Sequence, residues 1–177
     1  MQILEEAGRL IIRRKWFSAT AIILTAVCMI WDAALLIWVL SMQSDGSMPG
    51  ELSWEMVLPG LHGMVGMGFT YYTLACYLNK TDVILSPELI EVRIWPMKWP
   101  GAAAVAVDAV RQLYVASREQ RSHNGRQESY EVRLVGHDGR ERILVCGLET
   151  IDQARFIENE IEAILGIQNR PVSGEVL

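Results

Sequence analysis

The chain has 177 residues, of which 51% are hydrophobic and 21% charged, and its 16 Lys and Arg against 21 Asp and Glu give a formal net charge of -5. This apolar content excludes a disordered or collagen-like chain, and the negative charge opposes the electrostatic attraction that dominates nucleic-acid binding. The three cysteines, Cys28, Cys76 and Cys146, are odd in number and far apart. They indicate neither a disulfide framework nor a Cys-x-x-Cys site.

Residues 1–15 are short and amphipathic, and we expect them to form a cytoplasmic lead-in. Its first eight residues, MQILEEAG, favour a helix over any functional role. The lead-in holds four cations, Arg9, Arg13, Arg14 and Lys15.

Residues 16–78 are expected to form a two-helix transmembrane hairpin, with spans at about 17–40 and 57–78. In the first span Asp32 is the only formal charge among 24 residues, which at ~1.5 Å per residue extend ~36 Å and exceed a hydrocarbon core of ~30 Å. A cleaved signal peptide is the alternative, but the apolar stretch is too long and Asp32 interrupts it. The second span has no Asp, Glu, Lys or Arg, and its Pro59 lies near the first turn, where a missing N–H is tolerated.

The charges that flank the spans predict their orientation. Four cations precede the first span, whereas the connecting segment from Ser41 to Glu55 has no Lys or Arg. Because cations are retained on the cytoplasmic side, we expect both the N- and C-termini in the cytoplasm.

Asp32 and His62 are the polar pair that we single out within the spans. An unpaired carboxylate in hydrocarbon costs about 3 kcal/mol or more, so Asp32 should face protein or a polar cavity. Counted from the outer helix ends, Asp32 lies ~12 Å deep and His62 ~7.5 Å deep, a difference that side chains can bridge. Two interpretations stay open: a structural hydrogen bond or a neutral Asp32, and a proton or ion path that would need other subunits.

Small residues recur in the second span, at Gly60, Gly63 and Gly66. Such residues let helices approach closely in lipid, where packing drives association. Either the first span or an external partner occupies this surface, and a homo-oligomer is one such arrangement.

Residues 79–167 are mixed in charge and favour a cytoplasmic domain built mainly from antiparallel strands. Thr81–Ser86 and Leu89–Trp95 flank a Ser-Pro-Glu turn signal and predict a hairpin. Val110–Ser117 and Tyr130–Val135 alternate apolar and polar residues, and we expect a long polar loop between them.

Two further signals complete the strand pattern. Asp138-Gly139 predicts a tight hairpin into RILVC. A sixth strand is possible around Ala103 to Val107.

A helix follows the last strand. Thr150 and Gln153 form a capping-box pattern, and Gly166 provides a stop signal. The predicted apolar stripe consists of Ala154, Ile157, Ile161, Ile164 and Leu165. Residues 168–177 are left as a tail. This order predicts an α+β domain in which the helix covers an end or face of a strongly bent sheet.

Three segments behind two spans, LNKTDVILSPELIEVRIWP, HDGRERILV and GLETIDQARFIENEIEAILGI, resemble the bacterial membrane-anchored pleckstrin-homology-like (PH-like) domain proteins. The resemblance implies a multi-pass protein of the bacterial inner membrane. It also implies seven strands in a bent antiparallel sheet or barrel capped by a C-terminal helix, so residues from Pro96 to Asp108 must supply strands beyond the five clear ones. The hairpin tip Ser86-Pro87-Glu88 lacks paired basic residues, and phosphoinositide binding is not carried over.

The segment from Trp95 to Pro100 combines aromatic, apolar and cationic side chains. We expect Trp95, Met97, Lys98 and Trp99 to contact the membrane surface or a partner, because few residues separate this domain from the second span. The alternative is that both Trp side chains fold into the β core.

No catalytic or metal-binding motif is present: the three histidines lack Cys, His or carboxylate neighbours at metal-ligand spacing, and there is no Walker or Gly-x-Ser-x-Gly sequence. We therefore expect a non-enzymatic accessory subunit or assembly factor of a larger inner-membrane complex, with no cofactor and no nucleic acid. Its expected partners are membrane lipids and other integral membrane subunits. The alternatives are a lipid-headgroup or ligand-sensing module and an unrecognised membrane enzyme.

Overall fold

The computed structural model describes residues 1–6, 8–44, 54–122, 125–168 and 174–176. The chain divides into two compact units. The helical unit is Trp16–Asn79, and the β unit combines Met1–Lys15 with Lys80–Leu177. The predicted exterior loop lies largely outside the described residues, as do His123 of the predicted polar loop and most of the tail.

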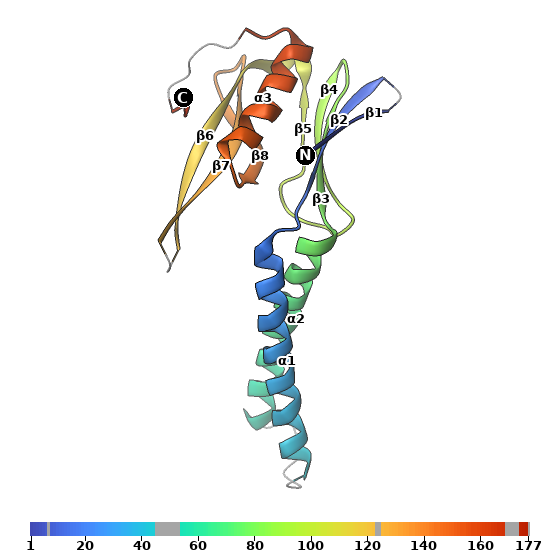
Figure 1. Cartoon of the computed structure of the whole chain (residues 1–177), viewed down its shortest axis with the longest axis vertical. Coiled ribbons are helices and arrows are strands. Elements are labelled where there is room, and N and C mark those ends of the chain that lie inside the picture. Colours follow the sequence, from blue (N-terminus) through green and yellow to red (C-terminus); the bar gives the residue numbers. More distant parts are fainter. Residues whose placement is uncertain (7, 45–53, 123–124, 169–173, 177) are drawn as a thin grey trace. The chain divides into compact units, whose positions relative to one another are not determined.

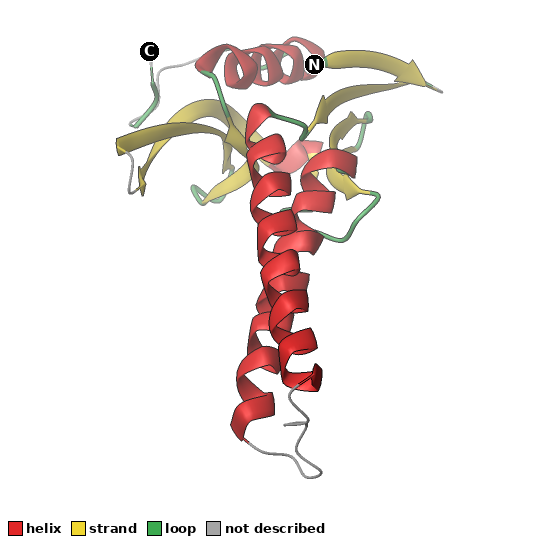
Figure 2. Cartoon of the chain, turned by 60° about the horizontal axis from the view of Figure 1, so that its bottom comes forward, coloured by secondary structure: helices red, strands yellow, loops and turns green. Residues whose placement is uncertain are grey.

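The helical unit consists of α1, Ala19–Ser44, and α2, Trp54–Leu78, which lie side by side (Figures 1 and 2). The N–H of Trp16 donates to the carbonyl of Asn79 over 3.1 Å and joins the two ends of the unit. Among the described residues, one helix is long and apolar enough to cross a membrane by its length and composition, and its span is Ala19–Gln43. The first predicted span therefore has its counterpart in α1.

The β unit begins with a result that contradicts the expected helical lead-in. Residues of the first segment form two strands, β1, Gln2–Glu6, and β2, Arg9–Lys15. β2 pairs in antiparallel fashion with β3, Lys80–Leu85, so that Ile12 lies opposite Val83. The helical prediction was wrong because the stabilising partner of β2 lies beyond the entire helical unit in sequence, and no local pattern shows it.

The five-stranded sheet continues from β3 to β4, Leu89–Trp95, and β5, Ala103–Ala106, in the order β1-β2-β3-β4-β5. The predicted hairpin of β3 and β4 is confirmed, since Lys80 pairs with Trp95 and Leu85 with Ile90. The possible sixth strand is β5.

A second, three-stranded antiparallel sheet contains β6, Val110–Ser122, β7, Gly125–Gly136, and β8, Glu141–Leu148, in that order. A short 3-10 helix, Val107–Ala109, leads into it. The Asp138-Gly139 turn is confirmed, with Gly139 in the left-handed region at φ 72°. The predicted long polar loop was wrong, because β6 and β7 remain paired as far as Ser122 and Gly125. Ladder hydrogen bonds join backbone groups, and they do not require apolar side chains.

Helix α3, Ile151–Leu165, has both predicted ends: Thr150 Oγ1 accepts from the N–H of Gln153 over 3.3 Å, and Gly166 is left-handed at φ 65°. α3 contacts all three strands of the second sheet. Its apolar stripe is narrower than predicted, since Ile164 is 48% exposed. Two carboxylic residues, Glu158 and Glu162, are buried instead.

One hydrophobic core joins both sheets and α3. Its most buried members include Ile12, Val83 and Ile90 from the first sheet, Leu113, Val132 and Leu134 from the second, and Ile157 and Ile161 from α3. The described residues thus form three α-helices and two antiparallel sheets, with eight strands where the resemblance implied seven. Two of the eight, β1 and β2, come from ahead of the helical unit, and six follow it.

The burial of β2 leads to a stability prediction. Ile12→Ala removes a side chain that is 1% exposed, and we expect it to lower the unfolding free energy of the β unit by about 2–5 kcal/mol. Ile3→Ala, on the neighbouring strand and 45% exposed, is the matched control and should change it by less than about 1 kcal/mol. Denaturant unfolding of the full chain in detergent measures both. Equal, small effects would contradict the assignment of β2 to the core.

Candidate functional site

The helix pair, α1 with α2, packs through small and polar contacts. Cys28 Sγ and Thr73 Oγ1 are 3.2 Å apart in a buried contact. The indole N–H of Trp31 donates to the carbonyl of His62 over 3.2 Å. The Trp31 ring lies beside Gly66, where an added Cβ would approach ring atoms to 3.1 and 3.2 Å. The two helices can therefore pack closely at this point because residue 66, which faces the Trp31 ring, is a glycine without a Cβ.

His62 lies between two tryptophans of α1. Its ring stacks on Trp31 at a centroid distance of 5.5 Å and an interplanar angle of 18°, and it meets Trp38 edge-on at 5.5 Å and 86°. Nδ1 of His62 is 3.0 Å from the carbonyl oxygen of Leu58, one turn earlier on α2. The imidazole is thus held on one side by its own helix and on two sides by indole rings.

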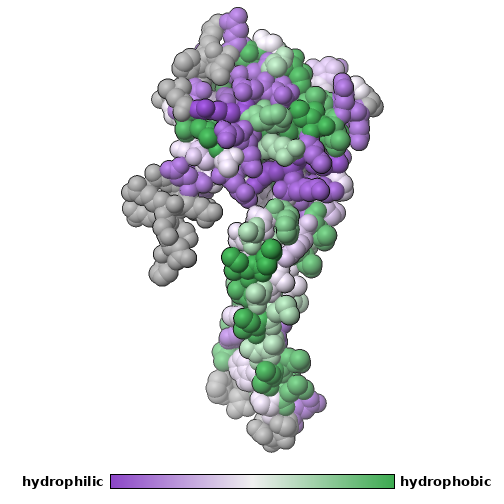
Figure 3. Space-filling model, in the orientation of Figure 1, coloured by the Kyte–Doolittle hydropathy of each residue, from purple (hydrophilic) through white to green (hydrophobic). Residues whose placement is uncertain are grey.

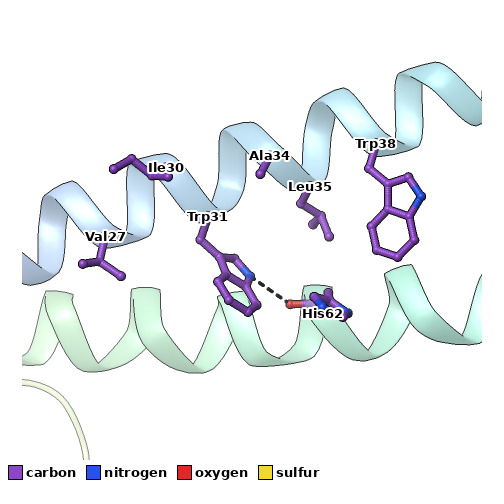
Figure 4. Close-up of a pocket in the computed structure, with 7 residues that line it drawn as sticks. All are labelled: Val27, Ile30, Trp31, Ala34, Leu35, Trp38 and His62. Atoms are coloured by element: carbon purple, nitrogen blue, oxygen red, sulfur yellow. Dashed lines mark hydrogen bonds between the residues drawn. The ribbon is translucent and has the colours of Figure 1, made fainter.

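These rings border a groove of about 380 Å³ that runs along α1 (Figure 4). The groove is lined by Val27, Ile30, Trp31, Ala34, Leu35, Trp38 and His62. His62 is the one ionisable residue among these lining residues. Figure 4 shows Trp31 and Trp38 pointing from α1 toward α2 on either side of His62.

Asp32 and His62, the pair singled out from sequence, are not joined by a hydrogen bond or ion pair among the contacts of the described residues. The Asp32 side chain is exposed, and its Oδ1 lies beside Gly66. His62 instead contacts Trp31 and Trp38. Depth counting placed the two residues at similar levels but did not specify which way each side chain points around its helix.

The three glycines have different surroundings. A Cβ at Gly66 would touch Trp31 and Asp32, a Cβ at Gly63 would reach Leu35 only at 4.0 Å, and a Cβ at Gly60 would meet nothing within 4 Å. Gly66 is therefore the residue at which the close helix contact requires glycine.

In the β unit, Asp82 is the centre of a polar cluster on the face of the first sheet opposite the core. The Arg13 guanidinium binds it through two contacts of 2.8 Å, Nε to Oδ1 and Nη2 to Oδ2. The indole N–H of Trp95 donates to Oδ2 over 2.7 Å. Arg13 and Lys80 also lie near the Trp95 ring, at 5.4 and 4.9 Å from its centroid. Such charge-assisted, bidentate bonds are the strong ones in proteins.

The pKa of Asp82 reflects this cluster. Burial alone would raise the pKa of its carboxyl, but hydrogen bonds from Arg13 and Trp95 outweigh burial and hold the pKa below its ordinary value. Arg14, the next residue of β2, lies on the opposite face of the sheet. Burial lowers the pKa of its guanidinium, and the negative charge of Glu149 offsets part of this lowering. Both arginines thus interact with carboxylates of the β unit, Arg13 with Asp82 and Arg14 with Glu149. They also belong to the group of cations from which the orientation was predicted.

Trp95 belongs to this polar cluster and is absent from the hydrophobic core of the described residues. Met97 and Trp99 are half-buried, and Lys98 is exposed. The expected alternative, in which both Trp side chains enter the core, is therefore wrong for Trp95. Sequence reasoning missed Asp82 and Arg13, which are 69 positions apart; the detectable signal was an aspartate within the otherwise apolar strand that contains Val83 and Ile84.

The described residues contain no group of three or more His, Cys, Asp or Glu side chains arranged to hold a metal ion. A scan against models of protein families finds no match for the chain, and a search of curated proteins finds no match either.

The glycine contacts lead to a prediction about the helix pair. Gly66→Ala forces Trp31 to move by a few tenths of an ångström, whereas Gly60→Ala meets nothing within 4 Å. We expect Gly66→Ala to be less stable than Gly60→Ala by about 1–3 kcal/mol, the usual range for overpacking. Unfolding of the full chain in mixed detergent micelles measures the difference. Two variants of equal stability would show that the interface at Trp31 tolerates the added methyl group.

The polar cluster leads to a pH prediction. Because the folded-state pKa of Asp82 is lowered, its stabilising contribution is present above the ordinary aspartate pKa and is lost as the pH falls through the lower folded value. Asp82→Asn should lower the unfolding free energy at neutral pH by about 1–3 kcal/mol and remove part of the acid sensitivity. The exposed Asp108 gives a matched control, Asp108→Asn. Unfolding curves at several pH values measure both effects. If the unfolding free energy of Asp82→Asn fell at acid pH as steeply as that of the unmodified chain, the prediction would be contradicted.

Proposed function

We propose that this protein is a non-enzymatic accessory subunit or assembly factor of a larger complex in a bacterial inner membrane. In this proposal α1 and α2 are both membrane spans, and the β unit is a PH-like domain on the cytoplasmic side. The observation that supports it best is the apolar groove along α1. Its lining offers apolar contact area for a partner, and His62 is the one ionisable side chain among its lining residues.

The exposed surface of the helix pair supports membrane anchoring. Large apolar side chains lie open along α1, among them Ile30 at 72% and Ile37 at 68% exposure, and along α2, among them Met64 at 67% and Met67 at 68%. Figure 3 shows apolar residues over most of the visible face of the helix pair, whereas the visible face of the β unit mixes polar and apolar residues. Monomeric soluble proteins rarely leave such a surface uncovered, so lipid or other helices are its natural surroundings.

The groove supports docking of a partner helix. Two Trp side chains and His62 are among its lining residues, and aromatic residues are enriched where binding energy is concentrated. In lipid, helices associate by packing and by isolated hydrogen bonds. A partner helix that places small side chains against Trp31 and Trp38 would fit this lining, and an acceptor beside the imidazole would add a hydrogen bond.

The cation asymmetry supports the orientation. Lys15 ends β2 four residues before α1, and Lys80 begins β3 two residues after α2. Cations that adjoin spans are retained in the cytoplasm, which places the β unit there in this proposal.

A groove-filling variant tests the function. Ile30 lines the groove and is 72% exposed, whereas Leu36 does not line it and is 59% exposed. We expect Ile30→Trp to reduce the amount of membrane proteins that co-purify with the full chain in mild detergent by about tenfold, the equivalent of ~1.4 kcal/mol. Leu36→Trp adds the same side chain on α1 outside the groove and should leave co-purification unchanged. Quantitative mass spectrometry of the purified material provides the measurement.

Two outcomes would contradict the proposal. Equal losses in both variants would show that a bulky residue anywhere on α1 disturbs the protein. Co-purification of lipid without any stoichiometric protein, in the unmodified chain, would instead favour the lipid-headgroup module.

A further inference from the structure

Two lysines lie side by side at the end of the five-stranded sheet, where the chain leaves the β unit and returns to it. Lys15 is the last residue of β2, Lys80 is the first residue of β3, and the two are direct partners in the antiparallel pairing. Side chains paired in this way project from the same face of a sheet. Like charges directly opposite one another are destabilising, so this pair is unfavourable unless an anion lies near both.

The carboxylates of the adjoining rows compensate this charge only in part. The next row on the same face consists of Arg13, Asp82 and Arg93, which are paired in register. Both oxygens of Asp82 already accept from the Arg13 guanidinium over 2.8 Å. Arg93 binds its own carboxylate, that of Glu91, over 2.9 Å. With the two lysines, these residues make four cations against two carboxylates, a net charge of +2.

Both ammonium groups keep donors for a further acceptor. Neither lysine takes part in an ion pair within the described residues. Lys15 is exposed, and the half-buried Lys80 has its Nζ 4.9 Å from the centroid of the Trp95 ring. A lysine ammonium carries three N–H donors. The end of the sheet thus presents two cationic groups beside one indole ring.

The chain itself keeps these groups close to the ends of the helical unit. α1 begins at Ala19, four residues after Lys15, and α2 ends at Leu78, two residues before Lys80. At ~3.5 Å per residue, the backbone of Lys80 lies within about 7 Å of the last residue of α2. Here the inference rests on the proposed function, in which α1 and α2 are membrane spans. This end of the sheet then lies at the level of the lipid headgroups.

We propose that Lys15 and Lys80 bind the phosphate group of an anionic phospholipid from the surrounding membrane, with the Trp95 ring beside it. The phosphate oxygens accept charge-assisted hydrogen bonds from both ammonium groups, and the negative charge offsets the repulsion between the two lysines. Tryptophan rings are enriched at the level of the headgroups, which agrees with the position of Trp95. The acyl chains stay in the bilayer, so the protein holds the lipid by its headgroup.

The net positive charge of the site determines which lipids it selects. A zwitterionic headgroup brings its own ammonium group, which the two lysines repel, whereas an anionic headgroup brings no cation. Basic residues near an anionic surface each favour binding by about fivefold. The site lies at the opposite end of β3 and β4 from the Ser86-Pro87-Glu88 tip, which has no basic residue. It also shares no residue with the groove of the helix pair.

Lipid titration of the delipidated full chain in non-ionic detergent tests the proposal. The probes are short-chain phosphatidylglycerol, short-chain phosphatidylcholine and inorganic phosphate, and native mass spectrometry measures the bound fraction of each. We expect phosphatidylglycerol to bind more tightly than phosphatidylcholine. Lys15→Gln/Lys80→Gln should weaken phosphatidylglycerol binding by about 25-fold, the product of about fivefold for each lysine.

Arg9→Gln is the matched control. Arg9 is an exposed cation on the same strand, six residues from Lys15 and therefore ~20 Å from it along β2. This variant should bind phosphatidylglycerol as the unmodified chain does. An equal loss in Arg9→Gln would show that any cation of the β unit attracts the lipid, and it would overturn the proposed site.

Three further results would overturn the proposal. They are equal affinity of the unmodified chain for the two lipids, unchanged affinity in the double variant, and binding of inorganic phosphate as tight as that of the lipid, which would indicate a site for free phosphate. If the double variant does not fold, Lys15→Gln alone provides a second route, because Lys15 is exposed. It should weaken binding by about fivefold, and unchanged affinity would again overturn the proposal. The titration uses the purified chain alone, so its failure is distinguishable from a failure of membrane proteins to co-purify.

Discussion

The pairing of β2 with β3 is the contact on which the rest of the β unit depends. The two strands are neighbours in one antiparallel sheet, yet the whole helical unit lies between them in sequence. Ile12 and Val83 extend the core on one face of this pair, and the Arg13–Asp82 ion pair joins the strands on the other. The helical unit is therefore an insertion between two adjacent strands, and the β unit requires both flanking segments to complete its core.

The pKa of a buried carboxyl in the β unit depends on whether hydrogen-bond donors meet it. Asp82 is almost fully buried and accepts from Arg13 and Trp95, so its charge is satisfied at neutral pH. Glu158 is equally buried, and burial raises its pKa to about 7; within the described residues its Oε1 has no hydrogen bond to offset this. The same carboxyl chemistry thus gives a lowered pKa at one site and a raised pKa at the other.

In the helix pair, residue spacing along the chain did not predict which side chains are in contact. Three glycines at intervals of three residues suggested a common packing face, but the close contact is made at Gly66, where Trp31 lies against the backbone. His62 was matched with Asp32 by depth, whereas its ring neighbours are Trp31 and Trp38. Rotation about the helix axis and the rotamers of large side chains decide such contacts, and neither is encoded in spacing along one chain.

Local signals were sufficient for the elements whose stabilising contacts are local. The Asp138-Gly139 turn, the hairpin of β3 and β4, the capped ends of α3 and the long apolar α1 all follow from residues within a few positions of one another. The pairing of β2 with β3, the continued pairing of β6 with β7, the burial of Glu158 and the Arg13–Asp82 ion pair were decided by tertiary structure. The physical reason is that each of these depends on surfaces or backbone partners that only the assembled sheets and helices bring together.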